Sequence, residues 1–452
     1  MVWMSVIDGR RRVRPGLQWA VAATAVTLLA ACSGGSGSTP DAAGSASAAG
    51  AATESSAGPV EFWGWVPGLE GLVADWNKAH PDIKVTFHRM TGDDGQKVEA
   101  AVDAGAGPDV VQLSTHNLPD YVIKKRVLDI GKYVADTKDL YTPASWKSVS
   151  FGTGVYGVPQ GSGPTAMLYR EDILKKHNIA VPKTWAEYEA AAIALHKADP
   201  KVYLAAFSPG EIGQWTQDLS QAGGSYFGIQ GDAWDVTVDN EAGQKVAARW
   251  QRLLDAKAVK VSQMWTPDYW ADVNAGRIAT ITYAAWFPVL MESNAKKLSG
   301  KWRIAPQPSE DGSAVAGDSG GAADVVLKGA KNVKGAAEFI TWINSSPEGV
   351  STLIKKGGIF PTTKIGLDDP ALKEKFAYFG DQVIYDVFRD ATLHVPNTWT
   401  DGPANGQVDS DITDGFGKVA NGKSTFSEVL KSVDAKAVER LKGMGLSVAG
   451  AP

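Results

Sequence analysis

The chain has 452 residues, of which 44% are hydrophobic and 21% are charged, and its formal net charge is −5. This composition is typical of soluble globular proteins, so it excludes a bundle of membrane helices and a wholly disordered chain. The acidic balance disfavours a nucleic-acid partner, and the length predicts two or three domains of ordinary size.

The N-terminus predicts an export signal. Four arginines lie between Arg10 and Arg14, and the apolar run from Trp19 to Ala31 that follows is too short to span a bilayer. A charged region followed by a short apolar stretch is typical of a secretory signal peptide, here residues 1–31. The Arg10-Arg11 pair leaves twin-arginine export open beside the general secretory route.

Cys32 is the only cysteine and directly follows Leu29-Ala30-Ala31. This segment resembles the lipobox of bacterial lipoproteins, which implies that Cys32 carries a diacylglycerol thioether and becomes the mature N-terminus. Two acyl chains anchor a protein stably, so we expect a protein bound to the extracellular (periplasmic) face of the cell membrane. The alternative is an ordinary cleavage site with a chance cysteine. The absence of a second cysteine excludes a disulfide within the chain.

A flexible tether is predicted between the lipid and the fold. Residues 33–58 are almost entirely Ser, Gly, Ala and Thr, without periodicity and with little apolar bulk. As a flexible coil they would span about 30 Å.

The folded part begins with a βαβαβ pattern. A strand over 60–65 precedes apolar residues at helical spacing up to Trp76, and His80-Pro81 ends that helix. A strand over 83–90, a helix over 96–104 and a strand over 109–113 follow. Such units build parallel sheets whose ligands lie beyond the carboxyl ends of the strands. Those ends are residues 63–67, 91–94 and 114–117.

Later segments continue the alternation of strands and helices. A strand is predicted over 165–169, and Thr184 and Glu187 have capping-box spacing at the start of a helix. Thr425 and Glu428 have the same spacing. Further helices are predicted over 240–256, 333–345 and 425–442.

Six segments in this order resemble the bacterial extracellular solute-binding proteins of family 1, the maltose-binding-protein-like receptors of ABC importers. They are Gly105 to Val111, Val155 to Pro159, Leu168 to Leu174, Pro182 to Glu187, Gln221 to Gly224, and Ala275 to Trp286. The resemblance implies an α/β fold of the type II periplasmic-binding-protein class, with two lobes, each a mainly parallel sheet flanked by helices, joined by hinge strands. It places crossings near Pro164, near Gly320 and between Ala371 and Phe379. Lobe 1 would comprise 59–164 and 321–374, and lobe 2 would comprise 165–320 and 375–452.

The same resemblance implies the function. A carbohydrate would bind in the cleft between the lobes and pass to an ABC permease with its ATPase, without a cofactor and without chemistry on the ligand, and the receptor would be a monomer. Two alternatives stay open: a secreted, lipid-anchored glycoside hydrolase, and a receptor for another solute such as a glycerol phosphodiester or a polyamine. The 50 acidic residues leave room for a hydrolase's carboxylate pair.

Two segments match enzyme motifs only in part. Gly317-Asp318-Ser319-Gly320-Gly321 matches the nucleophile motif of chymotrypsin-like proteases, but the matching histidine context and an all-β pattern are absent. The glycines of 152–157 fit the dinucleotide fingerprint, but Val158-Pro159 follows where a helix should begin. No pair of histidines or cysteines has metal-ligand spacing, so we expect no metal site.

Tryptophan is abundant, with 16 residues, and an indole suits the apolar C–H face of a sugar. Trp63 and Trp65 lie two apart at the end of the first strand and therefore share a face. Trp286 ends the strand 280–285, where members of the family often carry a sugar-stacking aromatic residue. Trp215 and Trp399 lie in loop-like surroundings. Six other tryptophans are expected in the core: Trp76, Trp146, Trp185, Trp250, Trp302 and Trp342.

Polar candidates accompany these rings. His116 and Asn117 follow the third strand, where a loop cap or a solvated histidine is an equal alternative. Gln160 lies near the first crossing, where a side-chain amide can bridge sugar hydroxyls. The remaining polar candidates are Asp94, which could equally cap a helix, Asp218 near Trp215, and Asp401 near Trp399.

Overall fold

The structure, a computed structural model, describes residues 56–90 and 95–450. These residues belong to one compact unit, Glu54–Pro452. The predictions made for the signal peptide, for Cys32, for most of the tether and for Asp94 lie outside the described residues. In the part of the chain that is described, no helix is both long enough and apolar enough to cross a membrane.

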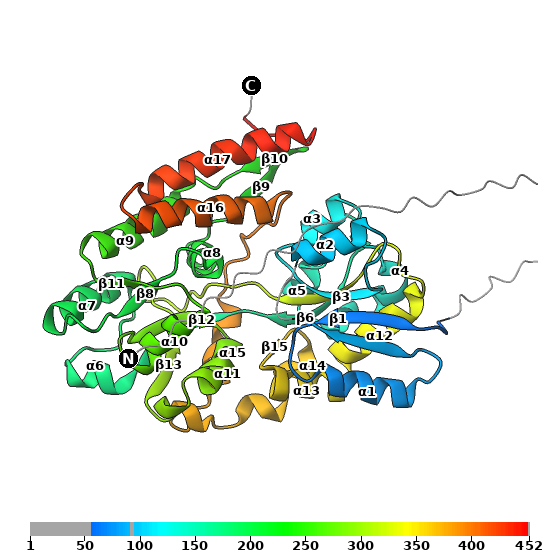
Figure 1. The fold of residues 1–452 in the computed structure, drawn as a ribbon, viewed down its shortest axis with the longest axis horizontal. Coiled ribbons are helices and arrows are strands. Elements are labelled where there is room, and N and C mark those ends of the chain that lie inside the picture. The colour runs from blue at the N-terminus through cyan, green and yellow to red at the C-terminus, as the bar shows by residue number, and fades with distance from the viewer. Residues whose placement is uncertain (1–55, 91–94, 451–452) are drawn as a thin grey trace, which may run out of the picture. The chain divides into compact units, whose positions relative to one another are not determined.

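A six-stranded sheet forms one half of this unit (Figure 1). β1, β2 and β3 pair in parallel, as the βαβαβ pattern predicts. β14 runs antiparallel to both β3 and β6, and β15 runs antiparallel to β6, so the sheet is mixed and not mainly parallel. These later strands enter from distant parts of the chain, which local periodicity does not encode. In sheet order the strands are β15 (Phe360–Pro361), β6 (Val158–Ser162), β14 (Ala322–Val326), β3 (Val110–Ser114), β1 (Val60–Gly64) and β2 (Val85–Arg89).

The other half contains smaller sheets. β7 (Thr165–Arg170) is the central strand of a three-stranded antiparallel sheet, between β12 (Thr280–Ala284) and β13 (Trp302–Pro306). The expectation of a mainly parallel second sheet is therefore wrong for these strands. The remaining pairs in this half are β8 (Ala205–Phe207) with β11 (Val259–Val261), which is parallel, and the hairpin of β9 (Phe227–Gln230) with β10 (Ala233–Val236). The hairpin of β4 (Ser150–Phe151) with β5 (Gly154–Val155) belongs to the first half, because Phe151 and Val155 pack in the core of the six-stranded sheet.

Helices cover these sheets, and both predicted capping boxes are present, at Thr184 with Glu187 and at Thr425 with Glu428. Figure 1 shows α2 and α3 on one side of the six-stranded sheet and α1, α12 and α13 on the other. The helices are α1 (Leu69–Ala79), α2 (Gly95–Asp103), α3 (Leu118–Ile123), α4 (Gly131–Val134), α5 (Pro143–Lys147), α6 (Glu171–Lys176), α7 (Trp185–Ala198), α8 (Ile212–Gln221), α9 (Glu241–Asp255), α10 (Pro267–Asn274), α11 (Phe287–Asn294), α12 (Val333–Ser345), α13 (Pro347–Gly357), α14 (Lys364–Leu367), α15 (Ile384–Leu393), α16 (Asn405–Ala420) and α17 (Phe426–Gly443).

Buried side chains form three hydrophobic cores. The first core packs against the six-stranded sheet and includes Phe62, Trp76 and Phe339. The second core joins α7, α8 and α9 to α16 and α17, and the third packs β7, β12 and β13 against α11 and α15. Phe360, which follows α13, belongs to the third core although β15 pairs with the six-stranded sheet. The lobe boundaries stay predictions.

Two stretches of backbone cross side by side between the two halves. The chain leaves the six-stranded sheet after Ser162, at the end of β6, and returns to it at Ala322, at the start of β14. The Ser319 amide donates to the Gly163 carbonyl over 2.9 Å, and the Thr165 amide donates to the Gly317 carbonyl over 3.0 Å. A Cβ atom at Gly163 would lie 2.2 Å from the Gly320 carbonyl oxygen, so this approach requires glycine. We call residues 163–165 and 317–321 the crossing segments.

Candidate functional site

An aromatic cluster lies where β12 ends. Residues of β12 are largely buried, and Trp286 follows as the N-cap of α11 because Phe287-Pro288 begins that helix. Trp286 is half-buried, and its ring stacks on Trp265 with the centroids 6.0 Å apart and the planes 26° apart. The Tyr283 ring meets Trp286 edge-on at 5.0 Å. We call Trp265, Tyr283 and Trp286 the aromatic cluster.

Trp265 is the exposed member of this cluster and was missed from the sequence. Its exposed fraction is 41%, and it precedes Thr266, the N-cap of α10. The signal that could have found it is its place in a loop between a strand and a helix, the context that singled out Trp399. The structure thus places Trp286 in a stacked pair with Trp265, and its part in sugar binding stays a prediction.

Glu211 ties the aromatic cluster to the start of α8. As the N-cap of α8 it accepts a hydrogen bond from the Gly213 amide through Oε1 at 3.0 Å, and the same oxygen accepts from the Tyr283 hydroxyl at 2.8 Å. Its Oε2 accepts from the Trp265 indole nitrogen. Burial, with the nearby Glu211 charge, raises the pKa of Tyr283 well above its usual value, so the phenol stays protonated as a donor.

The aromatic cluster lies beside a crossing segment. A Cβ atom at Gly213 would lie 2.7 Å from the Tyr283 hydroxyl and 3.1 Å from the Ser319 hydroxyl. On the other side, a Cβ at Gly358 would lie 2.8 Å from Val289 in α11, and one at Gly357 would lie 2.7 Å from Val66. The end of α13 therefore contacts both α11 and the loop after β1, which brings the carboxyl end of β1 toward the aromatic cluster.

Trp63 lies in β1, and Trp65 directly follows the strand, which ends at Gly64. Both are half-buried and pack against the first core. The Trp63 indole donates to Glu61 over 2.9 Å. The Trp65 amide donates to the Gln112 side chain over 2.8 Å, at the carboxyl end of β1. Their part in ligand binding stays a prediction.

His116 joins segments far apart in the sequence. β3 ends at Ser114, and the Thr115 amide donates to the Gly321 carbonyl over 3.0 Å, which places His116 next to a crossing segment. Its Nδ1 lies 2.9 Å from Asp401 Oδ1, and its Nε2 lies 2.9 Å from Asp409 Oδ2. Both ring nitrogens are thus paired with carboxylates, and a role of His116 in ligand binding stays a prediction.

Asp401 also holds Trp399. Its Oδ1 accepts hydrogen bonds from the Trp399 indole at 2.7 Å and from Asn405 at 3.0 Å. The Trp399 ring lies 5.8 Å from that of His116. The structure therefore brings three predicted residues, His116, Trp399 and Asp401, into one group, which with Asp409 we call the His116 cluster.

The charge of the His116 cluster is set by burial and by its carboxylates. Burial alone would lower the pKa of His116, but Asp409 and Asp401 raise it well above its usual value, so the ring is doubly protonated. Nearby, burial raises the pKa of Asp318 to about 6, and the Asp401 charge adds to this. Burial raises the pKa of Tyr226.

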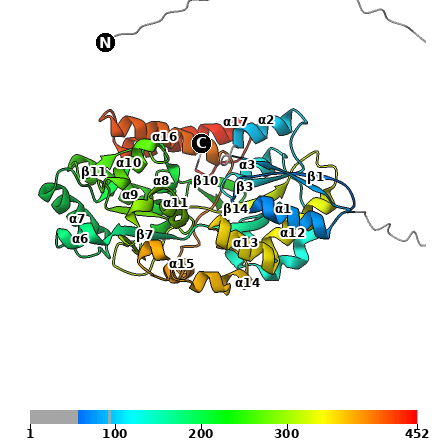
Figure 2. The same cartoon turned by 60° about the horizontal axis from the view of Figure 1, so that its bottom comes forward.

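The His116 cluster bridges two hydrophobic cores. Leu118, at the start of α3, belongs to the first core, and Val408 of α16 belongs to the second. The Ala404 amide donates to Asp120 of α3 over 2.6 Å, and α16 contacts α3 (Figures 1 and 2). Asn117 is the N-cap of α3 and is half-buried. A role of Asn117 in ligand binding stays a prediction.

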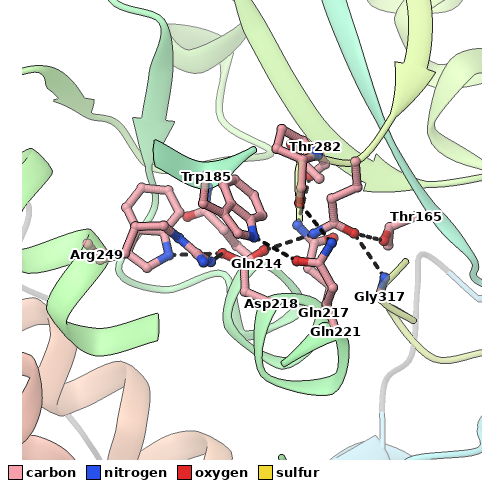
Figure 3. A network of polar contacts seen from close by, with 12 residues as sticks. Thr165, Trp185, Gln214, Gln217, Asp218, Gln221, Arg249, Thr282 and Gly317 are labelled. Carbon is pink, nitrogen blue, oxygen red and sulfur yellow. Dashed lines mark hydrogen bonds and ion pairs between the residues drawn. The ribbon is translucent and has the colours of Figure 1, made fainter. Parts of the chain in front are cut away.

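Two predicted ligand residues, Trp215 and Asp218, lie instead inside the second half of the unit. Trp215 falls within α8 and packs edge-on against Phe416 at 5.2 Å, with an exposed fraction of 2%. Asp218 is also 2% exposed and pairs with Arg249 over 2.8 Å (Figure 3). The prediction was wrong for both because Glu211 begins a helix where the sequence was interpreted as a loop.

The buried network around Asp218 extends to the crossing segments. Figure 3 shows Arg249 and Trp185 on one side of Asp218, and Thr165 and Gly317 on the other. Gln307 donates to Asp218 over 3.2 Å and accepts from Thr165 at 2.5 Å. A cavity of about 30 Å³ beside this network has room for about two water molecules, which is too small for a sugar.

Gln160 is the third predicted ligand residue for which the structure corrects the prediction. It is 3% exposed in β6, donates to Asp324 over 3.0 Å and accepts from Gln112. Burial raises the pKa of Asp324 to about 7. Both ends of the Gln160 amide are thus used within the sheet, because its side chain points into the core and not toward the crossing.

Among residues 56–90 and 95–450, no group of three or more His, Cys, Asp or Glu side chains is arranged to hold a metal ion.

The model of the bacterial extracellular solute-binding protein family matches residues 63–350. The chain belongs to this family.

Relatives of this solute-binding protein extend over most of its length. The arabinooligosaccharide-binding protein of Bacillus subtilis (strain 168) is 25% identical over 320 residues, which are 68% of this chain and 73% of the relative. The lactose-binding protein of Rhizobium radiobacter is 23% identical over 413 residues, 86% of this chain and 94% of the relative.

Two solved structures show the same fold. The ABC-transporter-associated binding protein of B. animalis subsp. lactis Bl-04, in complex with β-1,6-galactobiose, has a TM-score of 0.79 at 27% identity, covering 86% of this chain and 99% of that one. The galacto-N-biose-/lacto-N-biose I-binding protein of Bifidobacterium longum, in complex with lacto-N-biose, has a TM-score of 0.79 at 28% identity, covering 88% and 100%. These similarities confirm the predicted two-lobed type II periplasmic-binding-protein fold.

Proposed function

We propose that this solute-binding protein binds a carbohydrate, a disaccharide or a short oligosaccharide, beside the crossing segments and delivers it to an ABC importer. The observation that carries the proposal is the stacked pair of Trp265 and Trp286, which leaves the Trp265 indole exposed. The same cluster contains Tyr283, whose hydroxyl lies beside Ser319 of a crossing segment. The relatives named for arabino-oligosaccharides and lactose, and the solved complexes with two disaccharides, support the same ligand class.

The aromatic cluster suits the shape of a sugar. A pyranose has a flat C–H face that packs on an indole, and hydroxyls at its rim that need donors and acceptors. Trp265 supplies the flat surface, and the ends of β1 and β3 supply polar backbone and side chains on the facing sheet, where ligands of α/β sheets bind. Ligand capture would then close the two halves by bending at the crossing segments.

The remaining parts of the proposal concern the place and the partners of the protein. Cys32 carries the lipid, residues 33–58 act as a tether, and the fold stays on the extracellular face of the membrane as a monomer. The permease and its ATPase are the partners, and the protein performs no chemistry on the sugar. Cys32→Ala should release the protein from the membrane fraction or leave its signal peptide uncleaved.

Calorimetry with a panel of ligands tests the proposal. We expect stoichiometric binding of at least one of lactose, β-1,6-galactobiose, lacto-N-biose and arabino-oligosaccharides, and unchanged sugar by chromatography after long incubation. Binding of glycerophosphodiesters or polyamines instead would contradict the carbohydrate proposal. Hydrolysis that scales with the amount of protein would contradict the receptor and favour a glycoside hydrolase.

A further inference from the structure

Trp265 has an unusual backbone for an exposed bulky residue. Its φ is 69°, in the left-handed region that residues with a large side chain rarely adopt. Such a conformation persists only where the surroundings fix it, and it concentrates at binding sites. The indole nevertheless stays 41% exposed, so core packing alone does not explain why the ring is held there.

Contacts on two sides fix the ring. One face stacks on Trp286, and the edges meet Tyr283 and Phe287, each with the centroids 5.8 Å apart. These apolar contacts limit the position of the ring but are not directional. The hydrogen bond from the indole nitrogen to Glu211 adds a directional restraint, because it holds one edge of the ring toward the carboxylate.

Glu211 is itself held by other groups. Its Oε1 accepts from the Gly213 amide at 3.0 Å and from the Tyr283 hydroxyl at 2.8 Å, so the carboxylate is fixed at the N-terminus of α8, where negative charge is favourable. All three donors to Glu211 are neutral groups. Each carboxylate oxygen therefore has a defined donor, the Gly213 amide and the Tyr283 hydroxyl for Oε1 and the Trp265 indole for Oε2.

We propose that Glu211 is a positioning residue that fixes the Trp265 ring for sugar stacking. This inference rests on the proposed carbohydrate function and adds a residue that does not itself need to touch the sugar. Tyr283 transmits the same restraint, because its hydroxyl binds the other oxygen of the carboxylate. The sugar would then bind to a ring whose orientation is already set, so no freedom of that ring is lost on binding.

Glu211→Gln tests the inference with an almost isosteric side chain. A Gln oxygen can replace Oε1 toward Gly213, but its amide nitrogen then faces the Trp265 indole nitrogen, and two donors cannot bond. We expect about tenfold weaker binding of the tightest disaccharide in the panel, an unchanged melting temperature without ligand, and greater acrylamide quenching of the Trp265 fluorescence. That fluorescence is obtained by subtracting the signal of Trp265→Phe in each background.

Glu187→Gln is the matched control, since Glu187 also accepts backbone hydrogen bonds at a helix N-terminus but lies in the capping box of α7. It should leave affinity and quenching unchanged. If Trp265→Ala weakens sugar binding while Glu211→Gln changes neither affinity nor quenching, the inference is overturned and the proposed function stands. If Trp265→Ala itself leaves affinity unchanged, the aromatic cluster is not the sugar site. The quenching comparison needs no ligand, so it decides the positioning role even then.

Discussion

Helix α8 carries two carboxylates that both accept a hydrogen bond from an indole, yet their surroundings differ. Glu211, at its start, accepts from Trp265, the exposed member of the aromatic cluster. Asp218, in its second half, accepts from the buried Trp250 over 3.1 Å and pairs with Arg249, which lies over the Trp185 ring at 3.8 Å. Asp218 is buried and paired with a cation, so its contacts stabilise the fold. Glu211 accepts only from neutral donors and lies beside an exposed ring, so its contacts can orient a surface for a ligand.

The His116 cluster is intermediate between these two regions. It has charged groups like the Asp218 network, but the side chains of His116, Asp401 and Asp409 are 15% to 20% exposed, and the cluster joins α16 to the loop after β3. Stability measurements should therefore separate the three regions, with the largest effect at Asp218.

Asp218→Ala should lower the free energy of unfolding by about 3 to 5 kcal/mol, because it leaves Arg249 buried without its partner. Urea unfolding measures this, and Asp255→Ala, at the exposed end of α9, is the control. Retained stability together with lost sugar affinity would mean that the Asp218 network is the ligand site, and the comparison with Glu211 would fail.

His116→Gln should lower the free energy of unfolding by about 2 to 3 kcal/mol at pH 6, because two carboxylates lose a charged donor. Because the pKa of His116 is raised in the folded protein, the protonated ring stabilises the fold. This contribution is complete below the pKa of the unfolded state, about 6.5, and is lost as the pH rises through the higher pKa of the folded state.

The difference between wild type and His116→Gln should thus shrink as the pH is raised above about 6.5. Asp318 and Asp324 have pKa values raised to about 6 and about 7, so they change the free energy of unfolding mostly at lower pH. They do so in both proteins and therefore do not affect the difference. A difference that is independent of pH would show that His116 is not charged in the folded protein.

Trp399→Phe should have the smallest effect, about 1 kcal/mol of stability, because it removes one hydrogen bond to Asp401 and keeps an aromatic ring beside Tyr226. Thermal unfolding measures it. A large loss of sugar affinity with unchanged stability would instead make Trp399 a ligand residue, as the sequence predicted, and would extend the site from the aromatic cluster to the His116 cluster.

Local patterns predicted the elements well, because apolar spacing and capping residues act within a few positions. The strand predicted over 60–65 is β1, which ends at Gly64, and the capping box at Thr184 is confirmed. The strand predicted over 280–285 is β12, which ends at Ala284, two residues before Trp286. The sequence interpretation of Trp215 failed because Glu211 is an infrequent N-cap residue, so the start of α8 gave no clear signal.

Side-chain neighbours were harder to predict because they depend on distant parts of the chain. His116 and Asp401 are 285 positions apart, and no local spacing indicates that they meet. Gln160 was expected near the crossing, and it is, but the direction of its side chain depends on β14, which pairs with β6 from more than 150 residues away. The sequence therefore located regions of the site more reliably than it identified the groups that face a ligand.

Calorimetry of wild type and Trp265→Ala with β-1,6-galactobiose and lactose tests the central claim most directly. We expect wild type to bind at least one of them with 1:1 stoichiometry, and Trp265→Ala to lose about 2 kcal/mol, about 30-fold in affinity, while keeping its melting temperature without ligand. Trp234→Ala, in the β9–β10 hairpin, should keep the wild-type affinity. Equal affinity of wild type and Trp265→Ala for a sugar that binds would contradict the claim that the aromatic cluster is the carbohydrate site.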